Sequence, residues 1–385
     1  MVYTHHMRIN REAARDIVLL SSCALLLKFG LTPLLSTHDS YATIVAISIL
    51  GLGAIYALPK SAGLIESATE ILSQKTGLAA GLLQSLGTAF PDMILGVTAA
   101  ILSLQLLATD HDRAINLAIV AAATTFGSNI YNIGHAAWCI WRQNKADMIG
   151  KKILMFPFIK QGGMLSPLKF HRRKPSILEI DTATRLLTIL TLLTSSVALA
   201  MVAFGQVTTT LYQLVRPAGI ILFLSTAFVL YYYRSSVAHN AEADEAAATS
   251  PLTINSSTLT TISLIVAGVT IAITAESMIH SLELIGELTH IPYVVMGTLA
   301  GIVGCLGEML VIHNYSIHSN GRLGDALIGV AMDNIVTILG ASLVAIMGGI
   351  FLGGTSLITL FVVILTLNTI LIDQINRLKT NILSN

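Results

Sequence analysis

Charged residues are scarce in this sequence. Asp, Glu, Lys and Arg make up 11% of the 385 residues, against about 25% in ordinary soluble domains. Hydrophobic residues make up 54% of the chain, the mean hydropathy is +0.75 and the net charge is +1. No basic or acidic domain stands out as a soluble binding module, so nucleic acid is not an expected partner. This composition excludes an ordinary cytosolic enzyme.

Cysteine is also scarce, with three residues in the whole chain. Cys23, Cys139 and Cys305 lie inside apolar runs, and the sequence has no CxxC pair. These features argue against a disulfide framework and against a structural zinc site. We interpret all three as small buried hydrophobic residues, and we expect no tightly bound cofactor.

Long apolar runs make up most of the sequence. A helix needs about 20 apolar residues to cross about 30 Å of hydrocarbon, and a helix satisfies its own backbone there. The sequence predicts an all-α polytopic membrane protein with about ten transmembrane helices. The predicted spans are 16–37, 42–72, 77–107, 114–141, 182–204, 208–233, 258–284, 291–315, 323–350 and 355–375.

The distribution of Lys and Arg predicts the orientation. Ten spans leave both termini on one side, and the short loops of that side hold nearly all of the basic residues, whereas the opposite loops offer little beyond Arg113. Basic loops are retained in the cytoplasm during insertion. We therefore expect an integral, multi-pass protein of the plasma membrane with both termini in the cytoplasm.

The loops and spans divide the chain into four segments. Residues 1–41 form a cytoplasmic N-terminus and an extra transmembrane helix, and residues 42–234 form a first half that contains a basic cytoplasmic loop at 142–181. Residues 235–257 form an acidic cytoplasmic linker, and residues 258–385 form the second half. The apolar piece 153–159 is too short to span, so we expect it to lie on the membrane surface within a loop that sets the topology.

Polar motifs repeat between the two halves. The first half contains GTAFPD at 87–92 and GSNIYN at 127–132 on the next span. The second half contains GCLGE at 304–308 and DNIVT at 333–337 on the next span. Five spans separate the two pairs, and an odd number reverses the direction of the chain. The sequence therefore predicts two inverted-topology repeats, which in transporters meet at the substrate site.

Three carboxylates of the repeated motifs, Asp92, Glu308 and Asp333, fall inside predicted spans. A charge at membrane depth costs several kcal/mol unless it is paired, neutralised or bound to an ion, so such residues are functional candidates. Helical i,i+4 spacing places further oxygen-bearing side chains on the same faces. All of them are hard oxygen ligands, which suit calcium, magnesium or sodium better than zinc or copper. The predicted cation site comprises Thr88, Asp92, Ser128, Asn132, Glu308, Asp333 and Thr337.

Helix-breaking residues accompany two of these carboxylates. Pro91 lacks an N–H, so we expect it to open the helix beside Asp92 and free backbone carbonyls as cation ligands. In the second half Gly301, Gly304 and Gly307 recur at every third position. They favour a close helix-packing face, with local unwinding as the alternative.

Other polar residues have simpler interpretations. We expect His313 and His318 to be interfacial, with a transition-metal role as the minor alternative, and His135 to be a satisfied core histidine rather than a proton sensor. Lys60, Glu66 and Glu70 have the helical spacing of a local ion-pair network. Three glutamates of the second half have two possible interpretations, exposed helix-end carboxylates or an acidic vestibule that attracts cations. They are Glu276, Glu283 and Glu287.

These motifs resemble the alpha repeats of the cation/calcium exchanger superfamily, which includes sodium/calcium and calcium/proton exchangers. GTAFPD stands where the family has glycine-threonine-serine-x-proline-glutamate, and GSNIYN matches the second motif almost fully. The family's cation-binding positions fall at Thr88, Ala89, Asp92, Ser128, Asn132, Gly304, Cys305, Glu308, Asp333 and Thr337.

The second repeat departs from the family pattern. Ala89 and Cys305 replace serines, Gly304 replaces threonine, Gly307 replaces proline, and Asp333 stands where a serine is usual. The extra N-terminal helix resembles the calcium/proton branch, and a final family helix is missing.

The resemblance implies a secondary antiporter that exchanges calcium for sodium by alternating access, rather than an enzyme. Calcium and monovalent cations are the expected partners, together with membrane lipids. The intact Ser128-Asn129 pair favours sodium, whereas three nearby carboxylates favour a calcium/proton antiporter. A non-transporting cation sensor is the less favoured alternative. An intramembrane aspartyl protease is excluded because Arg322 breaks the required GxGD motif.

Overall fold

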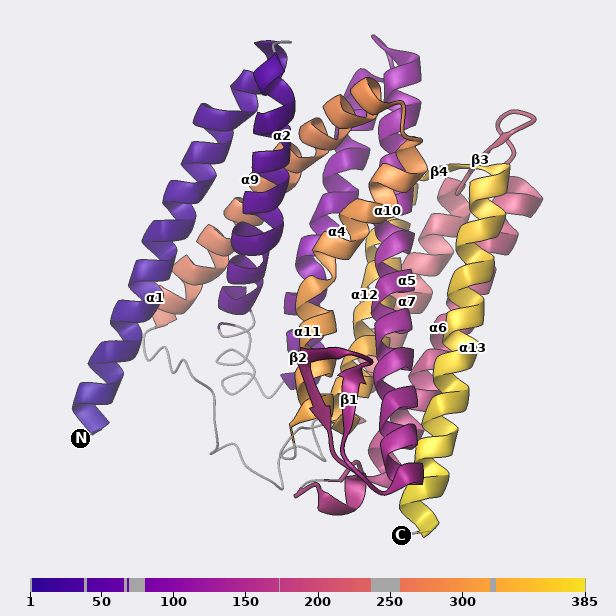
Figure 1. The fold of residues 1–385 in the computed structure, drawn as a ribbon. Helices are drawn as coiled ribbons and strands as arrows, with labels where there is room; N and C mark the ends of the chain where they lie inside the picture. Colours follow the sequence, from indigo (N-terminus) through magenta and orange to yellow (C-terminus); the bar gives the residue numbers. More distant parts are fainter. Residues whose placement is uncertain are drawn as a thin grey trace.

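The computed structural model is built almost entirely of long helices (Figure 1). It describes residues 2–37, 40–65, 68, 80–172, 174–236, 257–318 and 323–384. Within these residues, nine helices are long and apolar enough to cross a membrane, or ten if the bent pair α10–α11 counts as one span. The helices are α1 (Val2–Leu25, extended by η1 Leu26–Leu31 and η2 Thr32–Thr37), α2 (Ser40–Leu52, extended by η3 Gly53–Ala57), α4 (Ala80–Leu106), α5 (His111–Ile149), α6 (Ile177–Phe204), α7 (Arg216–Ser236), α9 (Ser257–Thr289), α10 (Tyr293–Gly304), α11 (Leu306–Ile317), α12 (Leu323–Met347) and α13 (Gly354–Ser384). The prediction of a multi-pass helical membrane protein is confirmed.

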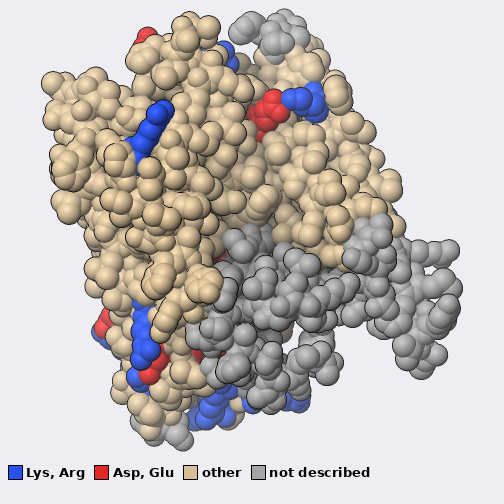
Figure 2. Space-filling view, turned by 180° about the vertical axis from the view of Figure 1, so that it is seen from behind, with Lys and Arg blue, Asp and Glu red and all other residues tan. Residues whose placement is uncertain are grey.

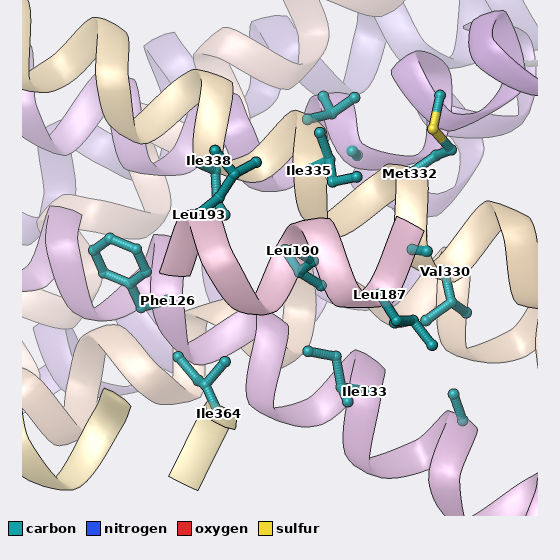
Figure 3. Packing of buried hydrophobic residues seen from close by; sticks show 14 of the residues in the cluster. Phe126, Ile133, Leu187, Leu190, Leu193, Val330, Met332, Ile335, Ile338 and Ile364 are labelled. Atoms are coloured by element: carbon teal, nitrogen blue, oxygen red, sulfur yellow. The ribbon is translucent and has the colours of Figure 1, made fainter. Parts of the chain in front are cut away.

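Two hydrophobic cores hold the helices together. The larger core joins α4–α7 with α10–α13, and Figure 3 shows Phe126, Leu190 and Ile335 among its buried side chains. The smaller core joins α1, α2 and α9, and Leu95 of α4 connects it to the rest. In Figure 1 this three-helix group stands to one side of the larger bundle, and both chain termini lie at the same end of the molecule.

The outer surface is apolar. Large side chains such as Phe29, Ile55 and Phe228 are more than half exposed. On the face seen in Figure 2, the Lys, Arg, Asp and Glu side chains gather toward the two ends and leave a broad band of other residues between them. A surface of this kind is stable in contact with lipid rather than water.

Ion pairs anchor α1 to its neighbours. Lys60 Nζ lies 2.8 Å from Asp16 Oδ2, and Lys28 Nζ lies 2.7 Å from Glu276 Oε1. Lys60 therefore pairs with another helix rather than locally, while Glu66 and Glu70 fall outside the described residues.

Ion pairs argue against an acidic vestibule at two of the three glutamates. Glu276 pairs with Lys28, and Glu283 pairs with Arg113 at the start of α5. Their negative charge is already compensated.

Two short strand pairs shape the predicted loops. Segment 153–159 is part of a hairpin, because β1 (Ile153–Phe156) pairs antiparallel with β2 (Ile159–Leu165). Trp138 of α5 donates to the Met155 carbonyl at 3.3 Å, and Met155 is fully buried, so the hairpin is docked on the helices. Met155 therefore packs on protein, whereas Phe158 and Ile159 at the turn are exposed.

A second strand pair, formed by segments far apart in the chain, shortens the sixth span. β3 (Leu211–Gln213) pairs with β4 (Phe351–Gly353), so the helix begins at Arg216 instead of residue 208. Pro217 suits this position because the first turn of a helix does not use its N–H groups.

The chain order gives the motif-bearing helices opposite directions. α4 and α5 are the third and fourth spans, whereas α10–α11 and α12 are the eighth and ninth, so the second pair runs in the reverse sense. α10 packs on α5, and α12 packs on α4. This is the arrangement expected of inverted repeats, and the symmetry between the halves remains a prediction. The linker residues 237–256 fall outside the described part of the chain.

Candidate cation-binding site

Four helices bring the predicted polar residues to one buried place. α4 carries Asp92, α5 carries Ser128 and Asn132, α11 begins with Glu308 in its first turn, and α12 carries a further pair. The side chains of Asp92, Ser128, Asn132, Glu308, Asp333 and Thr337 are all at most 5% exposed. Thr88 lies one turn before Asp92 on α4, and its side chain falls outside the described residues.

Contacts between helices join these residues. Asn132 Nδ2 donates a hydrogen bond to Glu308 Oε2, which links α5 to α11. The Asp92 carboxyl interacts with the hydroxyls of Ser128 and Thr337, which links α4 to α5 and α12. Glu308 lies within electrostatic range of both Asp333 and Asp92. Six residues that are far apart in the sequence therefore form one cluster.

Three oxygen atoms of this cluster have no protein partner. Asp92 Oδ1, Asn132 Oδ1 and Glu308 Oε1 are buried, and none has a hydrogen-bond partner among the described residues. A buried acceptor left unsatisfied costs about 1–3 kcal/mol, and more when it is charged. Three such oxygens in one cluster indicate a binding site for a cation, because hard oxygens are the ligands that calcium and sodium prefer.

The helix opening occurs in the second half, not at Pro91. α4 is a continuous helix through Pro91, so the expected opening there is wrong. The break lies at Cys305, where α10 and α11 meet at a bend of 50°. Gly301, Gly304 and Gly307 weaken the helix at this point, since each glycine costs about 0.8–1.0 kcal/mol relative to alanine. The last turn of α10 is left with carbonyls that lack intrahelical donors, close to Glu308.

The glycines before the break permit close helix contact. A Cβ atom at Gly301 would lie 2.6 Å from the Ser128 backbone nitrogen, and one at Gly304 would lie 2.7 Å from Asp92 Oδ1. Gly304 therefore cannot accept the family's threonine without moving Asp92. A Cβ at Gly307 would meet nothing within 4 Å, so this glycine belongs to the break rather than to the packing face.

Cys305 places a soft atom beside the hard oxygens. Its side chain is fully buried, and its Sγ approaches the Ile302 carbonyl at 3.5 Å. The thiol lies within electrostatic range of Glu308, Asp92 and Asp333.

We expect Cys305→Ser to strengthen cation binding. A hydroxyl is a harder ligand than a thiol and nearly the same size, so the half-saturating calcium concentration should fall by about threefold to tenfold. Calcium titration of purified protein measures this change. Cys23→Ser, a matched substitution of a buried cysteine in α1, is the control. Unchanged or weaker calcium binding by Cys305→Ser would contradict a role for this position in the site.

Asn129 is absent from the predicted cation site, although the Ser128-Asn129 pair favours sodium. Its side chain is 1% exposed, and neither its amide nitrogen nor its amide oxygen has a partner among the described residues. It lies between Ser128 and Asn132 in the GSNIYN motif. Its place within that motif was the available signal.

Comparison with known proteins identifies the fold. Neither a protein-family model nor a curated protein matches this chain. Among solved structures, native YfkE matches with a TM-score of 0.54 and 15% identity over 95% of both chains.

Structures of the sodium-calcium exchanger NCX_Mj are similar at a lower score. One soaked with 10 mM Na⁺ and zero Ca²⁺ has a TM-score of 0.49, and one soaked with 100 mM Na⁺ and 10 mM Sr²⁺ has 0.48, each with 15% identity over 89% of this chain and 98% of that one. On the strength of the YfkE match, the chain has the cation/calcium exchanger fold.

Proposed function

We propose that this protein is a secondary antiporter that exchanges calcium for sodium across the membrane by alternating access. The observation that carries the proposal is the group of buried oxygens of Asp92, Asn132 and Glu308 that have no hydrogen-bond partner among the described residues and that come from helices of both halves. Asp92 and Glu308 coordinate calcium directly. Ser128, Asn132, Asp333 and Thr337, with Thr88, complete the calcium shell or form flanking sodium sites.

Obligatory exchange follows from the charge of the cluster. Asp92, Glu308 and Asp333 are buried together, and repulsion among three carboxylates in a medium of low dielectric makes the empty site costly. The site therefore crosses the membrane filled, either with calcium or with the competing cation. The secondary transporter needs no catalytic group and no resident cofactor.

Two structural features supply the movement in this mechanism. The break at Cys305 lets α11 tilt on α10, and Asn132 follows Glu308 through their hydrogen bond. The group α1, α2 and α9 has its own core, which is joined to the larger core through α4 and α9, so the group shifts against the larger bundle as a unit. The distribution of basic loops favours the plasma membrane with both termini in the cytoplasm.

Neutral oxygens support sodium as the counter-ion. The hydroxyls of Ser128 and Thr337 and the amide of Asn132 ligate sodium, whereas a proton needs only a carboxylate. Proton coupling is the second candidate, and the departures from the family support it: Ala89, Gly304 and Cys305 supply no side-chain oxygen, while Asp333 adds a carboxylate.

Calcium uptake into proteoliposomes tests the proposal. An outward sodium gradient should drive uptake at least about tenfold above protein-free liposomes, because an empty return of the carrier is disfavoured. Uptake under an outward proton gradient alone would reassign the counter-ion. No uptake under either gradient, with calcium still bound by the purified protein, would favour the non-transporting sensor and contradict the antiporter.

A further inference from the structure

A second cluster of ligating side chains lies beside the oxygen site. His135 and Cys139 on α5 and His313 on α11 each offer a ligand atom, and these atoms all lie within 4.8 Å of one another. The two imidazole rings stack with centroids 5.6 Å apart. The sequence analysis treated His135 as a core histidine and His313 as interfacial, and the fold brings them together.

The geometry of the cluster suits a tetrahedral transition metal. His135 and Cys139 are an i,i+4 pair on one helix face, and His135 Nε2 lies 3.6 Å from Cys139 Sγ. Zinc holds nitrogen at about 2.0–2.1 Å and sulfur at about 2.3 Å, so two such ligands at tetrahedral angles are about 3.6 Å apart. Small rotations of the imidazole of His313 complete a three-ligand site with a fourth position open to water.

The ligand types separate this cluster from the oxygen site. Two imidazole nitrogens and a thiolate favour zinc and other late transition ions, whereas calcium and sodium prefer oxygen. Neither His135 nor His313 is among the proposed calcium ligands. His135 lies three residues after Asn132 on α5, and His313 lies five residues after Glu308 on α11, so the two sites share the same pair of helices.

Surrounding groups orient the ligands. His313 Nε2 lies 3.0 Å from the Gly162 carbonyl of β2, and donation of that N–H leaves Nδ1 as the ligand nitrogen. Metal-bound histidines commonly make such a bond to a backbone carbonyl. Ser316 hydrogen-bonds to Cys139. The Phe156 ring of β1 lies 5.6 Å from the ring of His313 and shields this side from water.

We propose that His135, Cys139 and His313 form a regulatory transition-metal site that binds Zn²⁺. Cys139 is fully buried and both histidines are partly exposed, so an ion enters past the imidazoles. A bound ion links α11 to α5 on the C-terminal side of the break at Cys305. It thereby holds Glu308 in one position and inhibits cation exchange. The inhibition rests on the proposed function, whereas metal binding does not.

Cobalt(II) titration of the purified full-length chain tests the site without any transport. Co²⁺ bound by a thiolate and imidazoles gives a sulfur-to-metal charge-transfer band, and we expect one equivalent that Zn²⁺ displaces. Cys139→Ser should abolish this band, and His313→Gln should weaken Co²⁺ binding about 100-fold. His318→Gln on the exposed end of α11 and Cys23→Ser in α1 are matched controls that should bind as the parent does.

Two results would overturn the metal site. One is the absence of a saturable band in the parent protein, and the other is equal binding by the parent and by both cluster variants. Thermal unfolding profiles like those of the parent show that the variants are folded.

Zinc sensitivity of the proteoliposome flux tests the regulation. Micromolar Zn²⁺ should reduce calcium flux about tenfold in the parent and in His318→Gln, and it should leave the flux of Cys139→Ser and His313→Gln unchanged. Zinc binding at the cluster with no effect on a measurable flux would overturn the regulatory role. If the protein shows no flux at all, the proposed antiport fails, and the Co²⁺ titration still decides the metal site.

Discussion

Glu308→Gln should lower calcium flux at least about 100-fold. The substitution preserves size but removes a full negative charge from a direct calcium ligand, and calcium sites depend steeply on ligand charge. Glu308 is buried with an unpartnered Oε1, while its Oε2 accepts from Asn132. Water cannot replace the lost charge at this depth. Calcium flux in proteoliposomes, normalised to the amount of inserted protein, measures the loss.

A matched change separates the site from a general charge effect. Glu287→Gln removes the same charge from an exposed position on α9 and should retain flux within about twofold. Asp92→Asn should behave as Glu308→Gln does, because both carboxylates serve one ion. Normal calcium flux in Glu308→Gln, with folding unchanged, would show that Glu308 is not a calcium ligand.

Gly301→Val should disrupt the crossing of α5 and α10. A Cβ at Gly301 would lie 2.6 Å from the Ser128 nitrogen and 2.8 Å from the Thr124 carbonyl oxygen, and both are backbone atoms that cannot rotate away. Overpacking of this kind costs about 1–3 kcal/mol or more. The helices must separate, and Ser128 then moves away from Asp92. We expect a clear fall in the thermal unfolding midpoint in detergent and calcium flux reduced to background.

Gly268→Val is the control for this substitution. It places the same side chain on α9, where a Cβ would meet nothing within 4 Å. Its thermal midpoint should stay near that of the parent, because valine has a slightly higher helix propensity than glycine. Equal midpoints and equal flux for Gly301→Val and Gly268→Val would rule out the tight crossing of α5 and α10.

Sequence patterns predict the parts of this fold that depend on local composition. Each predicted span corresponds to a helix, or to the bent pair α10–α11, because a run of apolar residues has one stable form in a bilayer. The candidate site residues could be selected from the sequence because the carboxylates of Asp92, Glu308 and Asp333 are conspicuous inside apolar runs. Their assembly with Ser128, Asn132 and Thr337 followed from i,i+4 spacing on helices that the structure brings together.

Features that depend on contacts between distant segments were missed. Pro91 does not open α4, whereas the break falls at Cys305, where close contacts at Gly301 and Gly304 constrain α10. The β1–β2 hairpin docks through hydrogen bonds with Trp138, Arg142 and His313 and through the burial of Met155, which no local pattern reveals. His135 and His313 lie on different helices, α5 and α11, that are far apart in the chain, so each looks isolated in the sequence.

An experimental structure of the protein with bound calcium tests the central claim most directly. The account predicts one strong ion peak between α4 and α11, with carboxylate oxygens of Asp92 and Glu308 at about 2.3–2.6 Å from it. Asn132 should supply a further oxygen, and the peak should weaken when sodium replaces calcium. An ion bound elsewhere, or no ion between Asp92 and Glu308 at saturating calcium, would contradict the assignment of this cluster as the transport site.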